Sequence, residues 1–199
     1  MGSTGYDDRY AENWQGAADS GIPRVGAYHY VITNVAATSQ LQNILRVTGG
    51  DFGSEPFTVD VERTNAERTA MQNGWIFPKA SYTAMLAALC QALRVYTPVR
   101  IYSSAIEWRT MTTGPLWAAG FPFHVAAYPF DPNSTTYRPD VPYPWTDWTL
   151  WQYSSSGRVP GIVGDCDLNR ERAAPPAPPP ADPLAAAVAG HARSILELV

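Results

Sequence analysis

The chain has 199 residues, 45% of them hydrophobic and 16% charged, which is the composition of a globular protein with room for one sizeable domain. Its formal net charge of −4 leaves no basic footprint, so nucleic acid is not an expected partner. No apolar run approaches the roughly 20 residues that a membrane-spanning helix needs, so a membrane is not an expected partner either.

The chain holds few of the residues that build disulfide frameworks or metal centres. Two cysteines, Cys90 and Cys166, cannot define a disulfide scaffold, and Cys90 falls in an apolar stripe that predicts a buried thiol. The histidines His29, His124 and His191 are widely spaced and show no metal-ligand pattern. We therefore expect no metal and no cofactor, and we expect His29 to be a satisfied core or wall residue.

Hydrophobic periodicity predicts helices and short strands in alternation. In chain order the expected elements are a helix at 8–20, a strand at 25–31, a helix at 35–47, a strand at 56–62, a helix at 79–94, a strand at 99–104, a helix at 105–111, and strands at 116–119 and 149–153. Long Pro- and Tyr-rich loops are expected over 121–147. Such alternation favours parallel βαβ units, so the predicted fold class is α/β.

The last part of the chain differs in composition from the rest. Residues 172–183 are rich in proline and predict an extended linker. Residues 184–199 are rich in alanine and predict a helical tail, or the start of a truncated module. The expected organisation is a domain over 1–171, then this linker and this tail.

Two carboxylates stand two positions apart in the apolar run 56–62. Side chains alternate faces along a strand, so Asp60 and Glu62 are expected to point the same way, roughly 6.5 Å apart along the chain. When like charges share a site, the pKa of one rises, so one group holds a proton while the other stays ionised. Glycosidic bond cleavage uses this division of labour, although two solvated acids on a surface strand would give the same pattern.

Other polar residues are expected at the same edge of the sheet. Ligands of α/β folds bind at the carboxyl ends of the strands. The predicted strands end near Glu62, Ser103, Ser104 and Gln152. The sequence therefore predicts a shared cleft at this edge.

Three segments in order resemble glycoside hydrolase family 25, the muramidases or Chalaropsis-type lysozymes. They are the Gly-Ala-Tyr-His-Tyr of 26–30, the strand-borne Asp-x-Glu, and the stretch 148–162 that precedes Asp167-Leu168-Asn169. The resemblance covers roughly residues 1–170. It implies an irregular TIM-like (β/α) barrel, hydrolysis of the β-1,4 bond between N-acetylmuramic acid and N-acetylglucosamine in peptidoglycan, an extracellular or cell-wall location, and a monomer.

The resemblance also assigns roles to individual residues. Glu62 matches the family's general acid, and Asp60 matches the partner carboxylate that steers the substrate's own acetamido group. Asp167 matches a further acid near the floor of the cleft. Four residues match positions that line the sugar groove: Tyr28, Tyr102, Trp117 and Gln152.

Aromatic residues at these positions have a second interpretation, in which they fill the barrel wall. Both packing and sugar binding are possible roles for Tyr102 and Trp117, whereas for Tyr28 we favour a place in the sugar-binding site. Three tryptophans spaced by three could form a binding platform, with packing expected for at least one of them: Trp145, Trp148 and Trp151.

The start of the chain departs from the family pattern. The family begins with a strand carrying Asp-x-Ser, then a helix and a second strand, and residues 1–5 align with the end of that second strand. We therefore expect an N-terminally incomplete barrel with unpaired strand edges. Such a chain is expected to be poorly stable or inactive unless something supplies the gap. No export signal is visible in its first residues.

Three other functions are weighed against the muramidase. The missing aspartate favours a non-catalytic remnant that binds glycan through its aromatic groove. A chitinase would carry further aspartates upstream in the same strand, where Phe57, Thr58 and Val59 stand. A metal-dependent phosphodiesterase would need clustered His and acidic ligands, which the sequence does not offer.

Overall fold

The structure of the chain is a computed structural model that describes residues 5–131, 133, 134 and 136–172. The predicted linker beyond Arg172 and the predicted tail over 184–199 lie outside the described residues. None of the helices in the described part has the length and hydrophobicity that crossing a bilayer demands.

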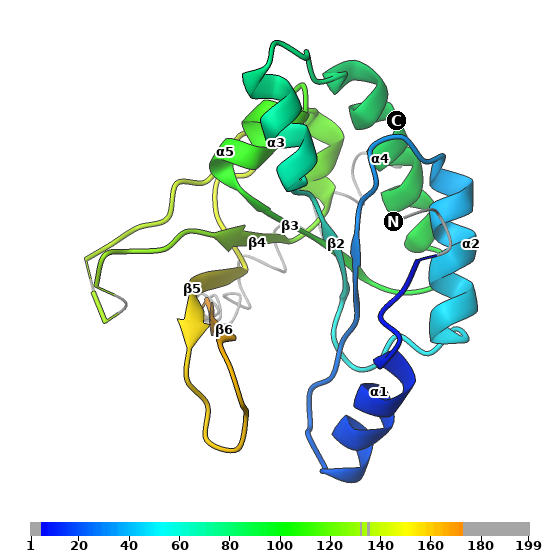
Figure 1. The fold of residues 1–199 in the computed structure, drawn as a ribbon, viewed down its shortest axis with the longest axis vertical. Coiled ribbons are helices and arrows are strands. Elements are labelled where there is room, and N and C mark those ends of the chain that lie inside the picture. The colour runs from blue at the N-terminus through cyan, green and yellow to red at the C-terminus, as the bar shows by residue number, and fades with distance from the viewer. Residues whose placement is uncertain (1–4, 132, 135, 173–199) are drawn as a thin grey trace, which may run out of the picture.

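The described strands form one six-stranded sheet in the order β1 to β6, which makes the molecule α/β as predicted (Figure 1). The strands are β1 (Tyr28–Tyr30), β2 (Phe57–Asp60), β3 (Val99–Ser104), β4 (Phe123–Ala126), β5 (Leu150–Gly157) and β6 (Cys166–Glu171). The first five are parallel, and β6 runs antiparallel to β5. Because β1 and β6 are edge strands and do not pair with each other, the sheet is a half-barrel.

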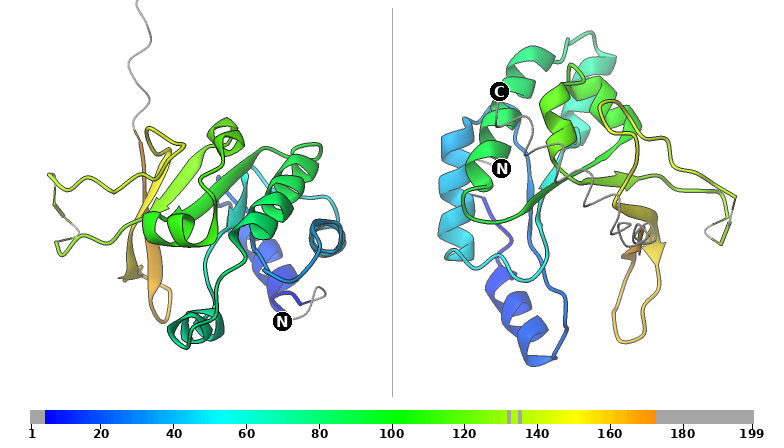
Figure 2. Two further views of the ribbon diagram at one scale, coloured as in Figure 1. Left: turned by 90° about the horizontal axis from the view of Figure 1, so that it is seen from above. Right: turned by 180° about the vertical axis from the view of Figure 1, so that it is seen from behind.

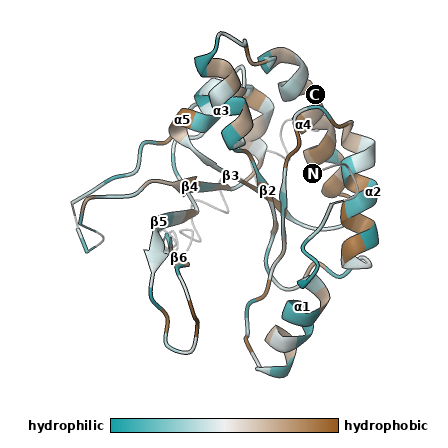
Figure 3. Ribbon diagram, in the orientation of Figure 1, coloured by the Kyte–Doolittle hydropathy of each residue, from teal (hydrophilic) through white to brown (hydrophobic). Residues whose placement is uncertain are grey.

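In the described part of the chain, five α-helices connect and cover the strands. They are α1 (Tyr10–Asp19), α2 (Ala37–Thr48), α3 (Asn65–Gln72), α4 (Lys79–Leu93) and α5 (Ala105–Met111). Helices α2 and α4 pack side by side against one face of the sheet, as two directions of view show (Figure 2). Hydrophobic residues are concentrated in α2, α4 and the strands, whereas α1 is largely hydrophilic and buries none of its residues (Figure 3).

The alternation of strand side chains gives the sheet one apolar and one polar face. Val59, Ile101 and Phe123 pair across β2, β3 and β4, and all three are at most 1% exposed. Their face packs on the helices, where the stripe predicted for 79–94 is buried, Cys90 included. The next residue of each strand faces the other way and is polar. This second face, hereafter the polar face, carries the candidate site.

Two segments differ from the prediction. Residues 116–119, predicted as a strand, form the 3₁₀ helix η1 (Leu116–Gly120), because alanine and glycine there are poor strand formers that follow a proline. The actual strand is β4, four residues long and hidden in the stretch predicted as loop. Strand β6 was also missed, because its residues are mostly polar and exposed.

Helix α3 was missed although the sequence carried a signal for it. Thr64 caps the helix by accepting a hydrogen bond from the Glu67 backbone N–H, and the Glu67 carboxylate accepts from the Thr64 N–H in return. This Thr-x-x-Glu spacing is a capping box. It ends the extended segment after β2 and turns the chain into α3.

An ion pair links the two outer strands of the half-barrel. Arg24, four residues before β1, donates hydrogen bonds of 2.8 and 3.3 Å to the carboxylate of Glu171, the last residue of β6. Arg24 also binds Glu55, which in turn pairs with Arg100 on β3. The open sides of the sheet are therefore tied together by charge rather than by strand pairing.

Candidate active site

The register of the sheet places four polar residues in one row of the polar face. Tyr30 of β1 pairs with Asp60, Asp60 with Tyr102, and Tyr102 with His124. Parallel strands in register bring such residues side by side. Asp60 and His124 are 8% and 9% exposed, so the row is largely withdrawn from solvent.

Asp60 is the last residue of β2, and its pKa is unusually high for an aspartate. Burial raises its pKa to about 8, and the charges of Glu62 and Asp167 act in the same direction. Its Oδ1 atom is buried and has no hydrogen-bond partner within the described residues. Such an atom is an acceptor that an incoming N–H group can use.

Glu62 follows two residues after the end of β2, so the strand is shorter than predicted. It is half-buried, and burial raises its pKa, followed by the charge of Glu107. Arg68 and a hydrogen bond from Tyr102 act in the opposite direction but do not cancel the increase. A glutamic acid with a raised pKa keeps the proton that a general acid must donate.

A hydrogen-bonded cluster joins β3, β5 and the segment after β4. The Tyr102 hydroxyl donates to Oε1 of Gln152 at 2.5 Å, and the Tyr128 hydroxyl donates to the same atom at 3.2 Å. Burial raises the pKa of both tyrosines, so their hydroxyls stay protonated as donors. Tyr128 was not singled out from the sequence, because the strand that positions it was not recognised.

His124 is a neutral member of the polar face. Its ring lies edge-on to Tyr102 with 4.9 Å between centroids, and its Nε2 is 2.7 Å from Oδ1 of Asn169. Burial lowers its pKa to about 4. His29, by contrast, is satisfied by Gln40 at 2.8 Å, as expected for a wall residue.

Two more of the predicted site residues lie near the carboxylates. Asp167 on β6 is exposed, and its charge is close enough to raise the pKa of Asp60 and Glu62. Tyr28 on β1 is 71% exposed, and the charges of Asp60 and Asp167 contribute to its raised pKa, after burial of its hydroxyl. The half-barrel thus gathers Tyr28, Asp60, Glu62, Tyr102, Gln152 and Asp167 around one area.

Trp117 is not brought to this area. It lies in η1, before β4 begins, and its ring packs edge-on against Phe121 at 5.8 Å. The guanidinium of Arg94 lies over the Phe121 ring, and Arg94 directly follows α4, on the segment that leads into β3. Trp117 therefore stands at the amino edge of the strands, whereas Asp60 and Glu62 stand at the carboxyl edge.

The three regularly spaced tryptophans are mainly packing residues. Trp145 stacks on Phe123 with centroids 4.1 Å apart, and Trp151 is 3% exposed. Trp148 lies edge-on to Trp151. Packing was expected for at least one of the three, and it is confirmed for Trp145 and Trp151.

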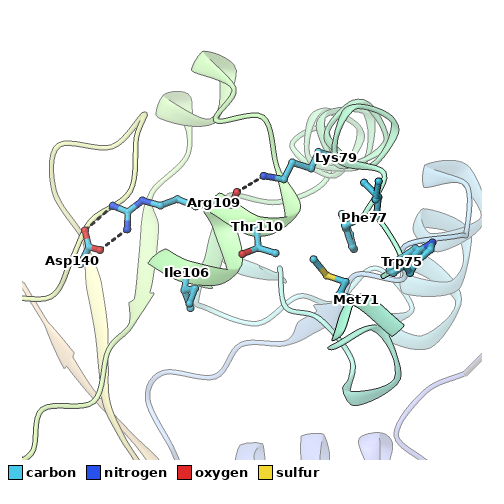
Figure 4. Close-up of a pocket in the computed structure, with 9 residues that line it drawn as sticks. Met71, Trp75, Phe77, Lys79, Ile106, Arg109, Thr110 and Asp140 are labelled. Carbon is cyan, nitrogen blue, oxygen red and sulfur yellow. Dashed lines mark hydrogen bonds and ion pairs between the residues drawn. The ribbon is translucent and has the colours of Figure 1, made fainter. Parts of the chain in front are cut away.

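Two cavities of the structure are lined by neither Asp60 nor Glu62. One, of about 600 Å³, opens on the outer surface between α3, α4 and α5, where Arg109 pairs with Asp140 and Lys79 donates to the Arg109 carbonyl (Figure 4). The other, of about 1040 Å³, runs along β1 and is lined by Tyr28 and Tyr30. Neither is lined by a carboxylate of the β2 pair, and the first lacks any cluster of acids.

Metal chemistry finds no support in the described side chains. No group of three or more His, Cys, Asp or Glu residues in this part of the chain is arranged to hold a metal ion.

A mostly parallel α/β half-barrel with two carboxylates at the carboxyl edge of one strand fits the class of barrel-type glycoside hydrolases. The model of the glycosyl hydrolases family 25 matches residues 1–162, and the chain belongs to this family.

Curated relatives differ in how far they have been characterised. Lysozyme M1 of Streptomyces globisporus is 32% identical over 178 residues, which cover 82% of this chain and 54% of that protein. The uncharacterized protein YegX of Escherichia coli O157:H7 is 31% identical over 163 residues, covering 82% of this chain and 53% of that protein. The chain therefore spans about half the length of the curated relatives it matches.

Solved structures agree with the fold. The bacterial lysozyme from Streptomyces coelicolor superposes with a TM-score of 0.68 at 30% identity, covering 85% of this chain and 77% of that one. The modular autolysin LytC from Streptococcus pneumoniae, solved with a synthetic peptidoglycan ligand, gives a TM-score of 0.60 at 21% identity and covers 84% of this chain and 38% of that one. The irregular barrel of these proteins corresponds to the six-stranded half-barrel seen here.

Proposed function

We propose that this chain hydrolyses the β-1,4 bond between N-acetylmuramic acid and N-acetylglucosamine in bacterial peptidoglycan. The observation that carries the proposal is the pair Asp60 and Glu62, half-buried to buried at the carboxyl edge of β2, each with a raised pKa. Membership of the glycosyl hydrolases family 25 supports the reaction class. LytC, solved with a synthetic peptidoglycan ligand, supports the substrate class.

Glu62 is the proposed general acid. It donates its proton to the glycosidic oxygen as the bond to the anomeric carbon breaks, which removes the need to expel an alkoxide. Its raised pKa favours the protonated form at a pH where an ordinary glutamate is ionised. Tyr102 stands beside it and acts on its pKa in the direction opposite to burial.

Asp60 is the proposed partner that orients the substrate's acetamido group. Its unpaired Oδ1 can accept the acetamido N–H, which turns the acetamido oxygen toward the anomeric carbon. Attack by the substrate's own group departs from the usual two-carboxylate scheme, so the spacing of Asp60 and Glu62 does not by itself predict the stereochemical outcome.

The remaining predicted residues are proposed to hold the sugars. Tyr28 offers an exposed aromatic face, and Gln152 and Asp167 offer polar groups near the carboxylates. Tyr102 and Tyr128 hold the Gln152 carbonyl, which leaves its amide N–H groups for sugar oxygens. A substrate of this kind implies work at the bacterial cell wall, outside the cytoplasm.

The test compares wild type with Glu62→Gln on purified peptidoglycan, following turbidity and the release of new reducing ends. We expect the substitution to lower the rate by at least roughly a hundredfold, because the proton donor is lost. Glu12→Gln, on the exposed face of α1, is the matched control and should leave the rate unchanged. Reducing ends released equally fast by Glu62→Gln would refute the role of Glu62.

A second function is favoured by the open sheet. β1 pairs on one side only among the described strands, so a half-barrel of this kind could bind glycan without reaching the geometry for cleavage. The test incubates the wild-type chain with peptidoglycan fragments for a long time. Binding without any new reducing ends would establish this alternative and refute the hydrolase proposal.

A further inference from the structure

A buried ion cluster stands directly behind Glu62 and takes no part in the proposed chemistry. Glu107 on α5 is 2% exposed, and its carboxylate accepts from two guanidinium groups. Arg63 donates through Nε at 2.8 Å and Nη2 at 2.9 Å, and Arg68 donates through Nη1 at 2.5 Å. Two parallel N–H···O bonds between Arg63 and Glu107 fix the geometry of both side chains.

The same carboxylate also binds the backbone next to Glu62. The N–H of Arg63 donates to Oε2 of Glu107 at 3.1 Å, and the C=O of Glu62 accepts from the Tyr30 hydroxyl at 2.8 Å. These two groups belong to one planar peptide unit, so that unit is held from both ends. The Val61 N–H binds the Tyr102 carbonyl on the near side.

The side chain of Glu62 starts from the Cα atom that precedes this peptide unit. A carboxyl that must reach a glycosidic oxygen within hydrogen-bond distance depends on the position of that atom. Glu62 lies beyond the end of β2, where strand pairing no longer fixes the backbone. For Glu62, the strand hydrogen bonds that fix Asp60 are therefore replaced by Tyr30 and Glu107 after its Cα atom, and by the Ser103 hydroxyl, which donates to the Val61 carbonyl at 2.7 Å, before it.

We propose that Glu107 and Arg63 form a positioning pair, which holds the peptide unit after Glu62 and so sets where the Glu62 carboxyl stands. This inference rests on the proposed function, in which Glu62 is the general acid. Neither residue touches the substrate in this scheme. Their effect reaches the reaction only through the backbone and through the charge of Glu107.

The charge of Glu107 gives the pair a second, measurable effect. Burial opposes its ionisation, but the hydrogen bonds and charges of Arg63 and Arg68 outweigh burial and lower its pKa, so Glu107 is an anion at neutral pH. An anion behind Glu62 favours the protonated acid. The other charged or titratable groups that act on or contact Glu62 come from every neighbouring element: Tyr30, Asp60, Arg68, Tyr102, Tyr128 and Asp167.

The test measures Glu107→Gln and wild type for kcat and KM on soluble peptidoglycan fragments across pH. We expect kcat to fall roughly ten- to a hundredfold because the acid is displaced, with KM nearly unchanged. The basic limb of the kcat profile should move down by about one pH unit, because the anion is lost and the two arginines stay. Asp140→Asn, which breaks the ion pair of Arg109 on the outer surface of α5, should leave kcat, KM and the basic limb unchanged.

Loss of one partner of a buried pair can prevent folding. A double variant, Arg63→Gln with Glu107→Gln, removes both charges and keeps two groups that can bind each other, so it should fold. It should still lose kcat roughly tenfold, because the guanidinium fork no longer holds the segment. A folded single or double variant with wild-type kcat and a wild-type basic limb would overturn the positioning role.

A measurement without substrate separates this inference from the proposed function. The carboxyl carbon of Glu62, assigned by its loss in Glu62→Gln, is titrated by ¹³C NMR in wild type and Glu107→Gln. We expect its titration to move to lower pH in Glu107→Gln. If wild type releases no reducing ends, the proposed hydrolase activity is refuted, but a shifted Glu62 titration still supports the positioning pair of Glu107 and Arg63. If the Glu62 titration does not move in Glu107→Gln, the positioning pair is refuted whatever the activity.

Discussion

The hydroxyl of Tyr102 donates a 2.5 Å hydrogen bond to Oε1 of Gln152, fifty residues further along the chain. Tyr128 donates to the same oxygen, so both lone pairs of the Gln152 carbonyl are engaged. Two strands that are not neighbours, β3 and β5, are thereby joined across the polar face. The amide end of Gln152 has its orientation set by tyrosines rather than by its own strand.

Replacing Tyr102 by phenylalanine should lower kcat about tenfold, because Gln152 loses its shorter hydrogen bond and with it the fixed orientation of its amide. The free energy of unfolding should fall by only about 1 kcal/mol, the usual net worth of such a bond. Kinetics on peptidoglycan fragments and urea denaturation check this. Tyr96→Phe, at an exposed position before β3, is the matched control. A kcat equal to that of wild type would contradict the role of this cluster.

Asp60 should make stability depend on pH. The pKa of Asp60 is about 8 in the folded chain and about 3.9 when unfolded. With respect to this group the folded state therefore binds more protons between these values, so the contribution of Asp60 to stability is most favourable below pH 4 and declines as pH rises toward 8. Each pKa unit is worth about 1.4 kcal/mol, so Asp60→Asn should gain several kcal/mol over wild type at pH 8.

Urea denaturation of wild type and Asp60→Asn at pH 4, 6 and 8 measures this gain. The same variant should be nearly inactive, because asparagine carries no negative charge to balance the positive charge that the acetamido group gains as its oxygen attacks. Parallel stability curves for the two proteins across this pH range would mean that Asp60 is not desolvated in the folded chain.

Arg68 should act on the pH profile in the direction opposite to Glu107. Its charge lowers the pKa of Glu62, and it also neutralises Glu107. Arg68→Gln should therefore raise the pKa of Glu62 and move the basic limb of kcat up by about half to one pH unit. Arg46→Gln, on α2, provides a control for loss of one surface charge. A shift of the basic limb to lower pH in Arg68→Gln would show that the neighbouring charges do not determine the pKa of Glu62.

Trp117 should matter for stability and not for substrate binding. Its ring packs on Phe121 at the amino edge, so Trp117→Ala should lower the free energy of unfolding by about 2 kcal/mol, less than a fully buried tryptophan costs. The KM for peptidoglycan fragments should stay at the wild-type value. An increased KM at unchanged stability would instead support the groove position that the family resemblance gave to Trp117.

Local periodicity was sufficient for the elements with strong patterns. The helix predicted at 79–94 is α4 (Lys79–Leu93), and the segments predicted at 99–104 and 105–111 coincide with β3 and α5. Each buries apolar residues at the regular spacing of its element, so the pattern can be recognised from neighbouring residues alone. Strand β4 could not be found in this way, because it lies among the prolines and tyrosines of 121–147 and its place depends on pairing with β3 and β5.

Residue types and short spacings were enough to predict the α/β class, the neighbouring carboxylates Asp60 and Glu62 at the end of one strand, and the family resemblance. Tertiary structure alone decided the environment of the pair. The raised pKa of Asp60 needs burial, the hold on Gln152 needs tyrosines from distant segments, and the support behind Glu62 needs Glu107 from another helix. Burial and charge act through space, and distances between residues far apart in the chain exist only once it has folded.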